Sequence, residues 1–353
     1  MCQSDLLRNS SPGSFPHSKT VKDVKPTISV AVIAYNQEDT IAQALDSILC
    51  QEGDFKLEVV IGEDAGTDGT LALCQDYEKR YPEVIKLLSG GPNLGIMGNF
   101  ARTVKACTGD YLAILAGDDY WCDNHKLQKQ VSYMQERPEF GVVCSNGYRL
   151  MVRTGQLMEG IAPFNPVPDG DVRNYYLNRY GGVYAMPLSL LIRSELMRYV
   201  DFDEYIRLGF PVEDYPLQSV LAHHTRFGYI PEKTVVYRVH QDSATFVSYD
   251  HPRYLTYHKG LIEIRRYLNG LYPEDVPFTD DWAADYLFYK EFLLYLHRLQ
   301  YKKACALVSE APAIIHQTPH YNQARKAIKT QAHFVAFHFY KRYVLNKDLK
   351  NRT

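Results

Sequence analysis

The sequence lacks long hydrophobic runs, a signal-peptide core and any large excess of charge of one sign. No stretch approaches the ~18 apolar residues that a membrane-spanning helix needs. The N-terminal region is rich in Ser and Pro over residues 10–18, where a secretory signal would be apolar. We therefore expect a cytoplasmic protein, and a position at the inner face of the cell membrane would also fit.

The chain also lacks the cysteine spacing of metal or disulfide proteins. Its seven cysteines are an odd number and include no Cys-any-any-Cys pair. A reducing compartment and no disulfide framework are expected. The formal net charge of −2 gives no global basic field, so we expect no nucleic-acid partner. The 353 residues suffice for a domain of ~200 residues and an appendage.

Residues 27–144 alternate between apolar runs and amphipathic segments. The run at 28–34 is β-branched and apolar on both faces, as in a strand buried on both sides. Further strands are expected at 57–61, 84–88, 111–115 and 140–144, and helices at 38–50, 68–81, 98–107 and 124–137. Short connections between alternating strands and helices predict an α/β fold with a mostly parallel, Rossmann-like sheet flanked by helices.

The two ends of the chain differ from this central part. Residues 1–26 are polar and Pro-containing, which predicts a flexible tail. After residue 150 the alternation stops, and residues 160–182 read as a long connection. Short strands are expected at 183–193, 228–230 and 235–237, and helices at 254–267, 281–299 and 321–343. The expected organisation is a tail over 1–26, an α/β domain over 27–247 and a C-terminal helical region over 248–353.

Two adjacent carboxylates, Asp118 and Asp119, follow the fourth expected strand. In open α/β sheets, ligands bind beyond the carboxyl ends of strands, where the strand order reverses. If the first strand lies beside the fourth, Tyr35 and Asn36 face the same crevice as these carboxylates. A diphosphate cannot approach bare carboxylates, but Mg²⁺ or Mn²⁺ prefers oxygen ligands and would bridge the two. The alternative is an ordinary turn, because Asp is common after strands.

A second polar cluster, residues 62–70, follows the second expected strand. Its Asp64 could accept hydrogen bonds from a base or a ribose. The alternative is a loop that caps the next helix through Thr67 or Asp68.

Two later clusters carry further candidate groups. Asp214, next to Glu213, could act as a general base on an acceptor hydroxyl, or the two could be a surface or capping pair. Arg238 could reach a phosphate and His240 could bind a metal, although a lone His after a strand is more often structural.

Taken in order, these clusters resemble the pattern of the family 2 glycosyltransferases, which have the GT-A fold. The resemblance covers about residues 27–245. Its elements are Tyr35-Asn36, Glu63-Asp64, Asn93-Leu94-Gly95, Asn99, Gly109-Asp110-Tyr111, Gly117-Asp118-Asp119, Glu213-Asp214 and Tyr237-Arg238-Val239-His240. The sequence departs from the pattern at Glu63, where Asp is usual, at Ala65-Gly66, where Gly-Ser is usual, and at Asp118-Asp119-Tyr120, where Asp-any-Asp is usual.

The resemblance implies an inverting, metal-dependent transferase of the hexosyl type. It would move a sugar from a nucleotide-diphosphate sugar, a UDP-sugar by preference, to a hydroxyl of a glycan or lipid-linked acceptor in bacterial surface-polysaccharide synthesis. The implied donor-nucleotide residues are Ala34, Tyr35, Asn36, Glu38, Asp64, Asn93, Gly95, Asn99 and Asp118. The implied metal ligands are Asp119, Asp118 and His240, the base is Asp214, and the acceptor or phosphate residues are Glu213, Arg238 and Trp121.

Two other functional classes compete with this one. A sugar nucleotidyltransferase would have a Gly-rich, basic loop after the first strand, but residues 36–39 are acidic here. A non-catalytic nucleotide-sugar-binding protein on the same fold stays open as an alternative, although the presence of Asp118, Asp119 and Asp214 together argues against it. Residues 248–353 match no known pattern. Their basic aromatic helix, including Phe337, could contact a membrane surface, although packing against its own domain is the favoured alternative.

Overall fold

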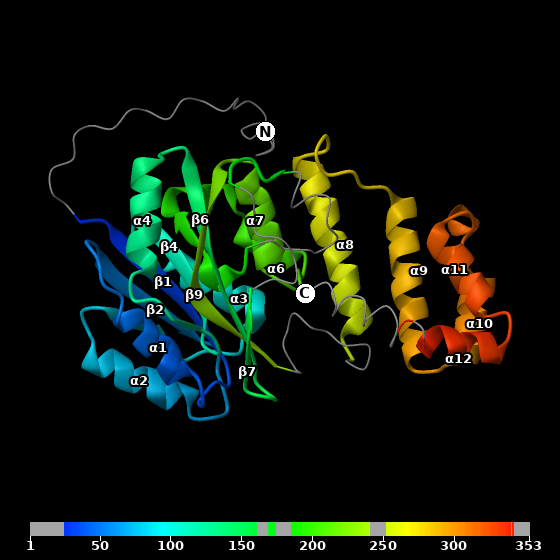
Figure 1. Ribbon diagram of the computed structural model, residues 1–353, viewed down its shortest axis with the longest axis horizontal. Coiled ribbons are helices and arrows are strands. Elements are labelled where there is room, and N and C mark those ends of the chain that lie inside the picture. The colour runs from blue at the N-terminus through cyan, green and yellow to red at the C-terminus, as the bar shows by residue number, and fades with distance from the viewer. Residues whose placement is uncertain (1–24, 161–168, 174–184, 241–251, 340, 342–353) are drawn as a thin grey trace. The chain divides into compact units, whose positions relative to one another are not determined.

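The computed structural model describes residues 25–160, 169–173, 185–240, 252–339 and 341 (Figure 1). Nearly all of the predicted tail and most of the predicted connection at 160–182 lie outside the described residues. The chain divides into two compact units, Met1–Glu204 with Glu213–Arg238, and Tyr205–Val212 with Val239–Thr353. The expected boundary at residue 247, between an α/β domain and a C-terminal helical region, stays a prediction.

The first unit is built on one mixed sheet whose centre is parallel. Strands β3 (Ile85–Leu88), β2 (Lys56–Glu63), β1 (Thr27–Ala34) and β4 (Tyr111–Ala116) lie side by side in that order, all parallel. The sheet continues from β4 through β8 (Leu191–Arg193), β6 (Phe140–Met151), β9 (Arg226–Val239) and β5 (Tyr120–Trp121), and β7 (Gln156–Glu159) pairs with β6. The expected α/β fold is confirmed.

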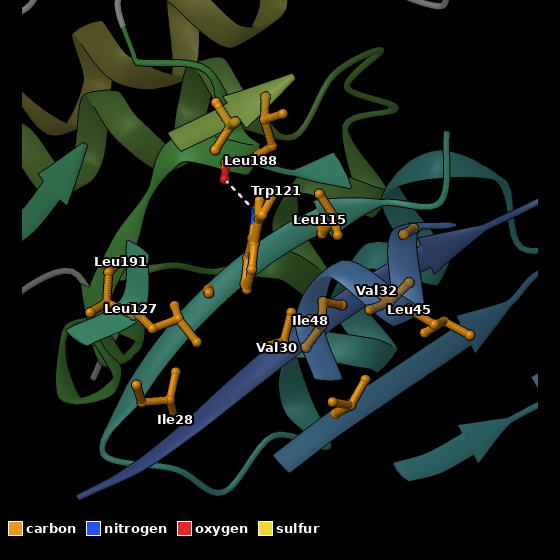
Figure 2. Close-up of a cluster of buried hydrophobic side chains, with 14 of the residues drawn as sticks. Ile28, Val30, Val32, Leu45, Ile48, Leu115, Trp121, Leu127, Leu188 and Leu191 are labelled. Atoms are coloured by element: carbon orange, nitrogen blue, oxygen red, sulfur yellow. Dashed lines mark hydrogen bonds between the residues drawn. The ribbon is translucent and has the colours of Figure 1, made fainter. Parts of the chain in front are cut away.

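Helices cover both faces of the parallel part. Helices α1 (Ile41–Leu49), α2 (Thr70–Arg80) and α4 (Lys126–Glu136) pack on the face that carries Val30 and Val32 of β1. Figure 2 shows part of this core, in which the fully buried residues of β1, α1 and α4 meet. Helix α3 (Gly95–Lys105) packs on β1 and β2, and a Cβ at Gly62 would collide with the side chain of Thr103.

Four predicted strands differ from the observed ones. The strand expected at 140–144 extends to Met151, because its outer half pairs with β7. The strand expected at 183–193 shortens to Leu191–Arg193, and a 3-10 turn (Pro187–Ser189) precedes it. The two strands expected around Pro231 form the single strand β9. Burial of apolar residues on both sides of this proline outweighs the local signal for a turn.

The remaining elements of the first unit surround the sheet. A 3-10 helix (Ser194–Tyr199) follows β8, and α7 (Asp214–Ala222) precedes β9. Helix α6 (Phe202–Arg207) contains the point at which the chain passes between the units.

The second unit is helical, as predicted. It contains α8 (Tyr254–Leu271), α9 (Asp280–His297), α10 (Tyr301–Ser309), α11 (Pro319–Ala327) and α12 (Gln331–Phe339), with a 3-10 turn at Ala313–Ile315. Helices α9 to α12 share a core that includes Phe292 and Phe334. Among the described residues, no helix has the length and apolar character needed to cross a bilayer.

Candidate active site

The first and fourth predicted strands are neighbours, as the proposed crevice requires. Ala34 ends β1 beside Glu63 of β2, and Ile33 lies opposite Ala116 of β4. The main-chain N–H of Gly117 donates to the carbonyl of Ile33 at 2.9 Å, which keeps the chains together beyond the end of β4. The loops after β1, β2 and β4 therefore leave the same edge of the sheet, where ligands of open α/β folds bind.

Arg238 of β9 holds the segment that carries the two candidate metal ligands. Its main-chain N–H donates to Oδ1 of Asp119 at 2.7 Å. Its guanidinium donates to the carbonyl oxygen of Asp118 and to Oε1 of Gln43 on α1, and lies 4.8 Å from the ring centroid of Tyr120. Because Arg238 is almost fully buried, its contacts hold the backbone of Asp118 and Asp119 in a fixed position.

Asp119 is held in an environment that disfavours its charge. Burial raises the pKa of this carboxyl well above its usual range, and the charge of Asp118 raises it further. The main-chain N–H and the charge of Arg238 act in the opposite direction. A divalent cation would relieve this penalty by supplying the missing positive charge.

The donor atoms at this site suit Mg²⁺ or Mn²⁺. Both candidates are carboxylates, and hard divalent cations prefer oxygen ligands. Oδ1 of Asp119 accepts from Arg238, which leaves Oδ2 as the oxygen that a cation would meet. Within the described ranges, no group of three or more His, Cys, Asp and Glu residues is assembled for a metal. A cation here would therefore complete its coordination with ligand oxygens and water.

The loop after β1 is tied to the loop after β2 by its own predicted ligand-binding residues. Asn36 adopts a φ of 50°, a left-handed conformation that Asn tolerates, and its Oδ1 accepts from the N–H of Thr67 at 2.7 Å. Oε2 of Glu38 accepts from the N–H of Gly69 at 2.6 Å. The Tyr35 side chain is 48% exposed, so its ring is available to a base.

Asp64 is an organiser of the neighbouring loop. It is 4% exposed, and its Oδ1 accepts from the N–H of Leu94 at 2.8 Å, with Nη2 of Arg102 at 4.0 Å. Its carbonyl oxygen accepts from Nδ2 of Asn93 at 2.7 Å. Gly95, with a φ of 71°, begins α3 directly after these contacts. Asp64 thus fixes the start of α3, and its contact with a nucleotide stays a prediction.

Asn99 lies beneath the site and is fully buried. Its Nδ2 donates to the carbonyl of Gly62 at 2.8 Å, and its Oδ1 accepts from Nε of Arg102 at 2.9 Å. Arg102 also donates to the carbonyl of Glu63 at 2.5 Å. Asn99 is therefore placed to position the β2 loop and has no surface to offer a ligand. Neither Arg102 nor Gln43 was predicted from the sequence, although Arg102 follows Asn99 by three positions on one helix face.

Trp121 is a core residue in this structure. Its indole N–H donates to the carbonyl of Leu188 at 3.0 Å, as the dashed line in Figure 2 shows. Its main-chain N–H donates to Oγ of Ser47 at 3.1 Å, and Nζ of the buried Lys126 lies 4.2 Å from its ring centroid. The predicted acceptor contact has little exposed surface to use, because Trp121 is buried by α1, α4 and the 3-10 turn.

Glu213 and Asp214 stand at the N-terminus of α7. Both are half-buried, and Oδ1 of Asp214 accepts from the N–H of Tyr215 at 2.7 Å. Burial raises the pKa of both carboxyls, and the charge of Asp214 raises the pKa of Glu213 further. A carboxylate with a raised pKa is a better proton acceptor near neutral pH. His240 follows β9 directly and belongs to the second unit, so its role as a metal ligand stays a prediction.

The comparisons with known proteins agree with this architecture. Residues 29–195 match the family model described as glycosyl transferase family 2. An uncharacterized protein of Mycobacterium tuberculosis is 40% identical over 128 residues, which are 36% of this chain and 37% of that protein. The abequosyltransferase RfbV of Salmonella typhimurium is 30% identical over 199 residues, which are 52% of this chain and 58% of RfbV. The matched part thus spans between about a third and three-fifths of these relatives.

A solved structure shares the fold over most of the chain. Residues 1–349 of TarS from Staphylococcus aureus, solved in complex with UDP-GlcNAc, align with a TM-score of 0.53 and 15% sequence identity. The alignment covers 90% of this chain and 91% of that one. The fold is thus of the GT-A type that nucleotide-sugar transferases use. Over residues 29–195 the chain is similar to glycosyl transferase family 2.

Proposed function

We propose that this protein transfers a sugar from a nucleotide-diphosphate sugar, a UDP-sugar by preference, to a hydroxyl of a glycan or lipid-linked acceptor. The observation that carries the proposal is the junction of β1 and β4, which brings Tyr35 and Asn36 to the same sheet edge as Asp118 and Asp119. The named activity of RfbV and the UDP-GlcNAc complex of TarS support a nucleotide-sugar donor. TuaG of Bacillus subtilis, a relative whose name is putative teichuronic acid biosynthesis glycosyltransferase, supports a role in surface polysaccharides. Such a role would fit an enzyme at the cytoplasmic face of the membrane.

The donor would bind with its base beside Tyr35 and its diphosphate toward the carboxylates. The exposed ring of Tyr35 offers a face on which a base can stack. Asp118 and Asp119 would hold Mg²⁺ or Mn²⁺, whose charge stabilises the departing diphosphate. The Arg238 guanidinium donates hydrogen bonds to Asp118 and Gln43. Its role would therefore be to hold the backbone beside the two carboxylates in place.

The transfer would be a single displacement with inversion. The acceptor oxygen attacks the anomeric carbon on the face opposite the diphosphate, the new C–O bond forms and the bond to the diphosphate oxygen breaks. Asp214 accepts the proton that the hydroxyl loses. Its raised pKa makes this carboxylate a stronger base than an exposed aspartate.

Asp214→Asn separates the enzyme from a non-catalytic binding protein. We expect the variant to lose turnover with a panel of UDP-sugars by ~100-fold or more, because it lacks the general base. Thermal stabilisation by UDP with Mn²⁺ should persist. Asp203→Asn is the matched control, at a side chain that is 81% exposed. It should keep both the turnover and the thermal stabilisation of the parent. Equal turnover in both variants would exclude Asp214 as the base.

A further inference from the structure

The C-terminal part of the chain carries a charge that the rest does not share. Residues 298–353 contain 11 of the 39 Lys and Arg residues but only two of the 41 Asp and Glu residues. Their formal charge is therefore +9, whereas the preceding 297 residues carry −11. Such a division of charge within one chain is typical of proteins that meet an anionic surface with one region.

The helices of this region direct their apolar side chains inward. Helices α9 to α12 pack around Phe292, Ala304 and Phe334, all fully buried. Phe337 packs against the same core, so the packing alternative for this aromatic residue is confirmed. The aromatic residues in this core therefore contribute to the stability of the unit, whereas several of the basic side chains of residues 298–329 are exposed.

Five basic side chains of α10, α11 and the turn between α11 and α12 are exposed. They are Lys302, Lys303, Arg325, Lys326 and Lys329. Among the residues that the structure describes, none of the five is joined to a carboxylate by an ion pair. Their charge is therefore not compensated locally and is available to an external anion.

Large apolar side chains are also exposed in this part of the chain. Leu299 is 50% exposed and lies in the turn between α9 and α10, three residues before Lys302. Its φ of 52° is unusual for a leucine and belongs to this tight turn. Ile314, in the connection to α11, is 57% exposed. An open pocket between α11 and α12 combines Lys326 and His333 with apolar side chains, among them Ala336 and Phe337.

We propose that the α9–α10 turn, with Leu299, Lys302 and Lys303, binds the surface of an anionic phospholipid bilayer. The lysines attract lipid phosphates, and Leu299 enters the head-group layer, where an apolar side chain gains free energy. The exposed cations of α11 add to the attraction. A nucleic acid would use the cations but not Leu299 and Ile314, which favours the bilayer. The inference goes beyond the proposed sugar transfer and does not depend on it.

The test is co-sedimentation of the full chain with vesicles. One set contains phosphatidylcholine alone, and the other contains ~30% phosphatidylglycerol as the anionic lipid. We expect binding to the second set only, and a loss of binding at high salt. Lys302→Gln with Lys303→Gln should weaken the binding by ~30-fold, since each lysine near an anionic surface contributes ~1 kcal/mol to the free energy of binding. Lys56→Gln with Lys79→Gln removes two exposed lysines from the first unit and should leave binding unchanged.

A second variant tests the apolar contact without loss of folding. Leu299→Asn suits the left-handed backbone of the turn, so the variant should fold, and it should still bind vesicles less well than the parent. Three results would overturn the proposal. The first is that the chain does not bind anionic vesicles at low salt, and the second is that the two double-lysine variants lose vesicle binding equally. The third is that a DNA fragment competes fully with the vesicles while Leu299→Asn has no effect on vesicle binding. Thermal stabilisation by UDP with Mn²⁺, measured on the same variants, reports on the donor site separately.

Discussion

The main-chain N–H of Arg238 donates to Oδ1 of Asp119 across 119 residues of sequence. The antiparallel pairing of β5 with β9, in which Tyr120 lies opposite Val236, continues this contact. The backbone of β9 therefore fixes the orientation of the buried carboxylate, and the Arg238 side chain fixes the loop that precedes it. Substitutions of Asp119 and of Arg238 should therefore have different effects.

Asp119→Asn should stabilise the protein in the absence of metal while it destroys the function. The amide oxygen can still accept from Arg238, but the buried charge beside Asp118 is gone. We expect the melting temperature in EDTA to equal or exceed that of the parent, and turnover to fall by ~100-fold or more. Scanning calorimetry and an assay with UDP-sugars and Mn²⁺ check the two parts. A destabilised variant with normal turnover would contradict the assignment.

Arg238→Gln should weaken both the fold and the donor site. The substitution removes the guanidinium bonds to Asp118 and Gln43 and its contact with Tyr120, while the backbone bond to Asp119 stays. Loss of buried hydrogen bonds from a charged donor typically costs ~1–3 kcal/mol in the free energy of unfolding. We expect a lower melting temperature and a higher KM for the donor.

Arg137→Gln is the control for this change. Arg137 is the residue that follows α4, and its guanidinium lies near Tyr133 and Glu136 with 45% of the side chain exposed. Neither the melting temperature nor the KM should change by much. If both variants raise the KM equally, the effect is one of overall charge and the positioning role of Arg238 is lost.

The pH profile of turnover should report the Glu213–Asp214 pair. Burial raises the pKa of both groups, so the base stays protonated to a higher pH than an exposed carboxyl, whose pKa is ~4. The rate should therefore rise with pH toward neutrality. In Glu213→Gln the burial that raises the pKa of Asp214 remains, so the rise should stay above the pH range of an exposed carboxyl. A kcat/KM profile that is flat between pH ~5 and ~8 would contradict a base with a raised pKa.

Lys126 should make stability depend on pH above neutrality. Burial lowers the pKa of this amine to about 7, whereas the unfolded chain has the usual value of ~10.4. Between these values the unfolded state binds more protons than the folded state, so this amine increases stability as the pH rises. Urea unfolding should show that the parent gains stability relative to Lys126→Met from pH ~7 to pH ~9.

Lys129→Met is the matched control on the same helix. Lys129 is partly exposed and pairs with Asp123 at 2.5 Å, so its replacement should add no such dependence over the same pH range. A constant difference between the parent and Lys126→Met at all pH values would mean that the buried amine keeps an ordinary pKa.

The sequence predicted the frame of the site well, because that frame rests on local signals. The buried apolar runs of β1 and β4 are unmistakable, and their neighbourhood places Asn36 and Asp118 at one edge. Parallel topology then follows from short helical crossovers. The fold class and the sheet edge at which the site lies could therefore be predicted from the sequence.

The state of individual side chains could not be predicted, because it depends on partners distant in sequence. Asp64 is bound to Leu94 and lies near Arg102, and Asn99 is bound to Gly62. A motif records that such residues are present but not that other loops use their hydrogen-bonding groups. Trp121 shows the same limit, since the family resemblance implied an acceptor or phosphate contact for a side chain that is buried in the structure.

Thermal stabilisation by nucleotides would show whether Asp118 and Asp119 form a metal-dependent donor site. The parent and Asp119→Asn would be heated with each common nucleoside diphosphate, with and without Mn²⁺. The account predicts a rise of several degrees in the melting temperature of the parent with UDP, dependent on Mn²⁺ and absent in the variant, because a ligand that binds only the folded state stabilises it. No metal-dependent rise with any nucleotide, or an equal rise in both proteins, would contradict a donor site built on Asp118 and Asp119.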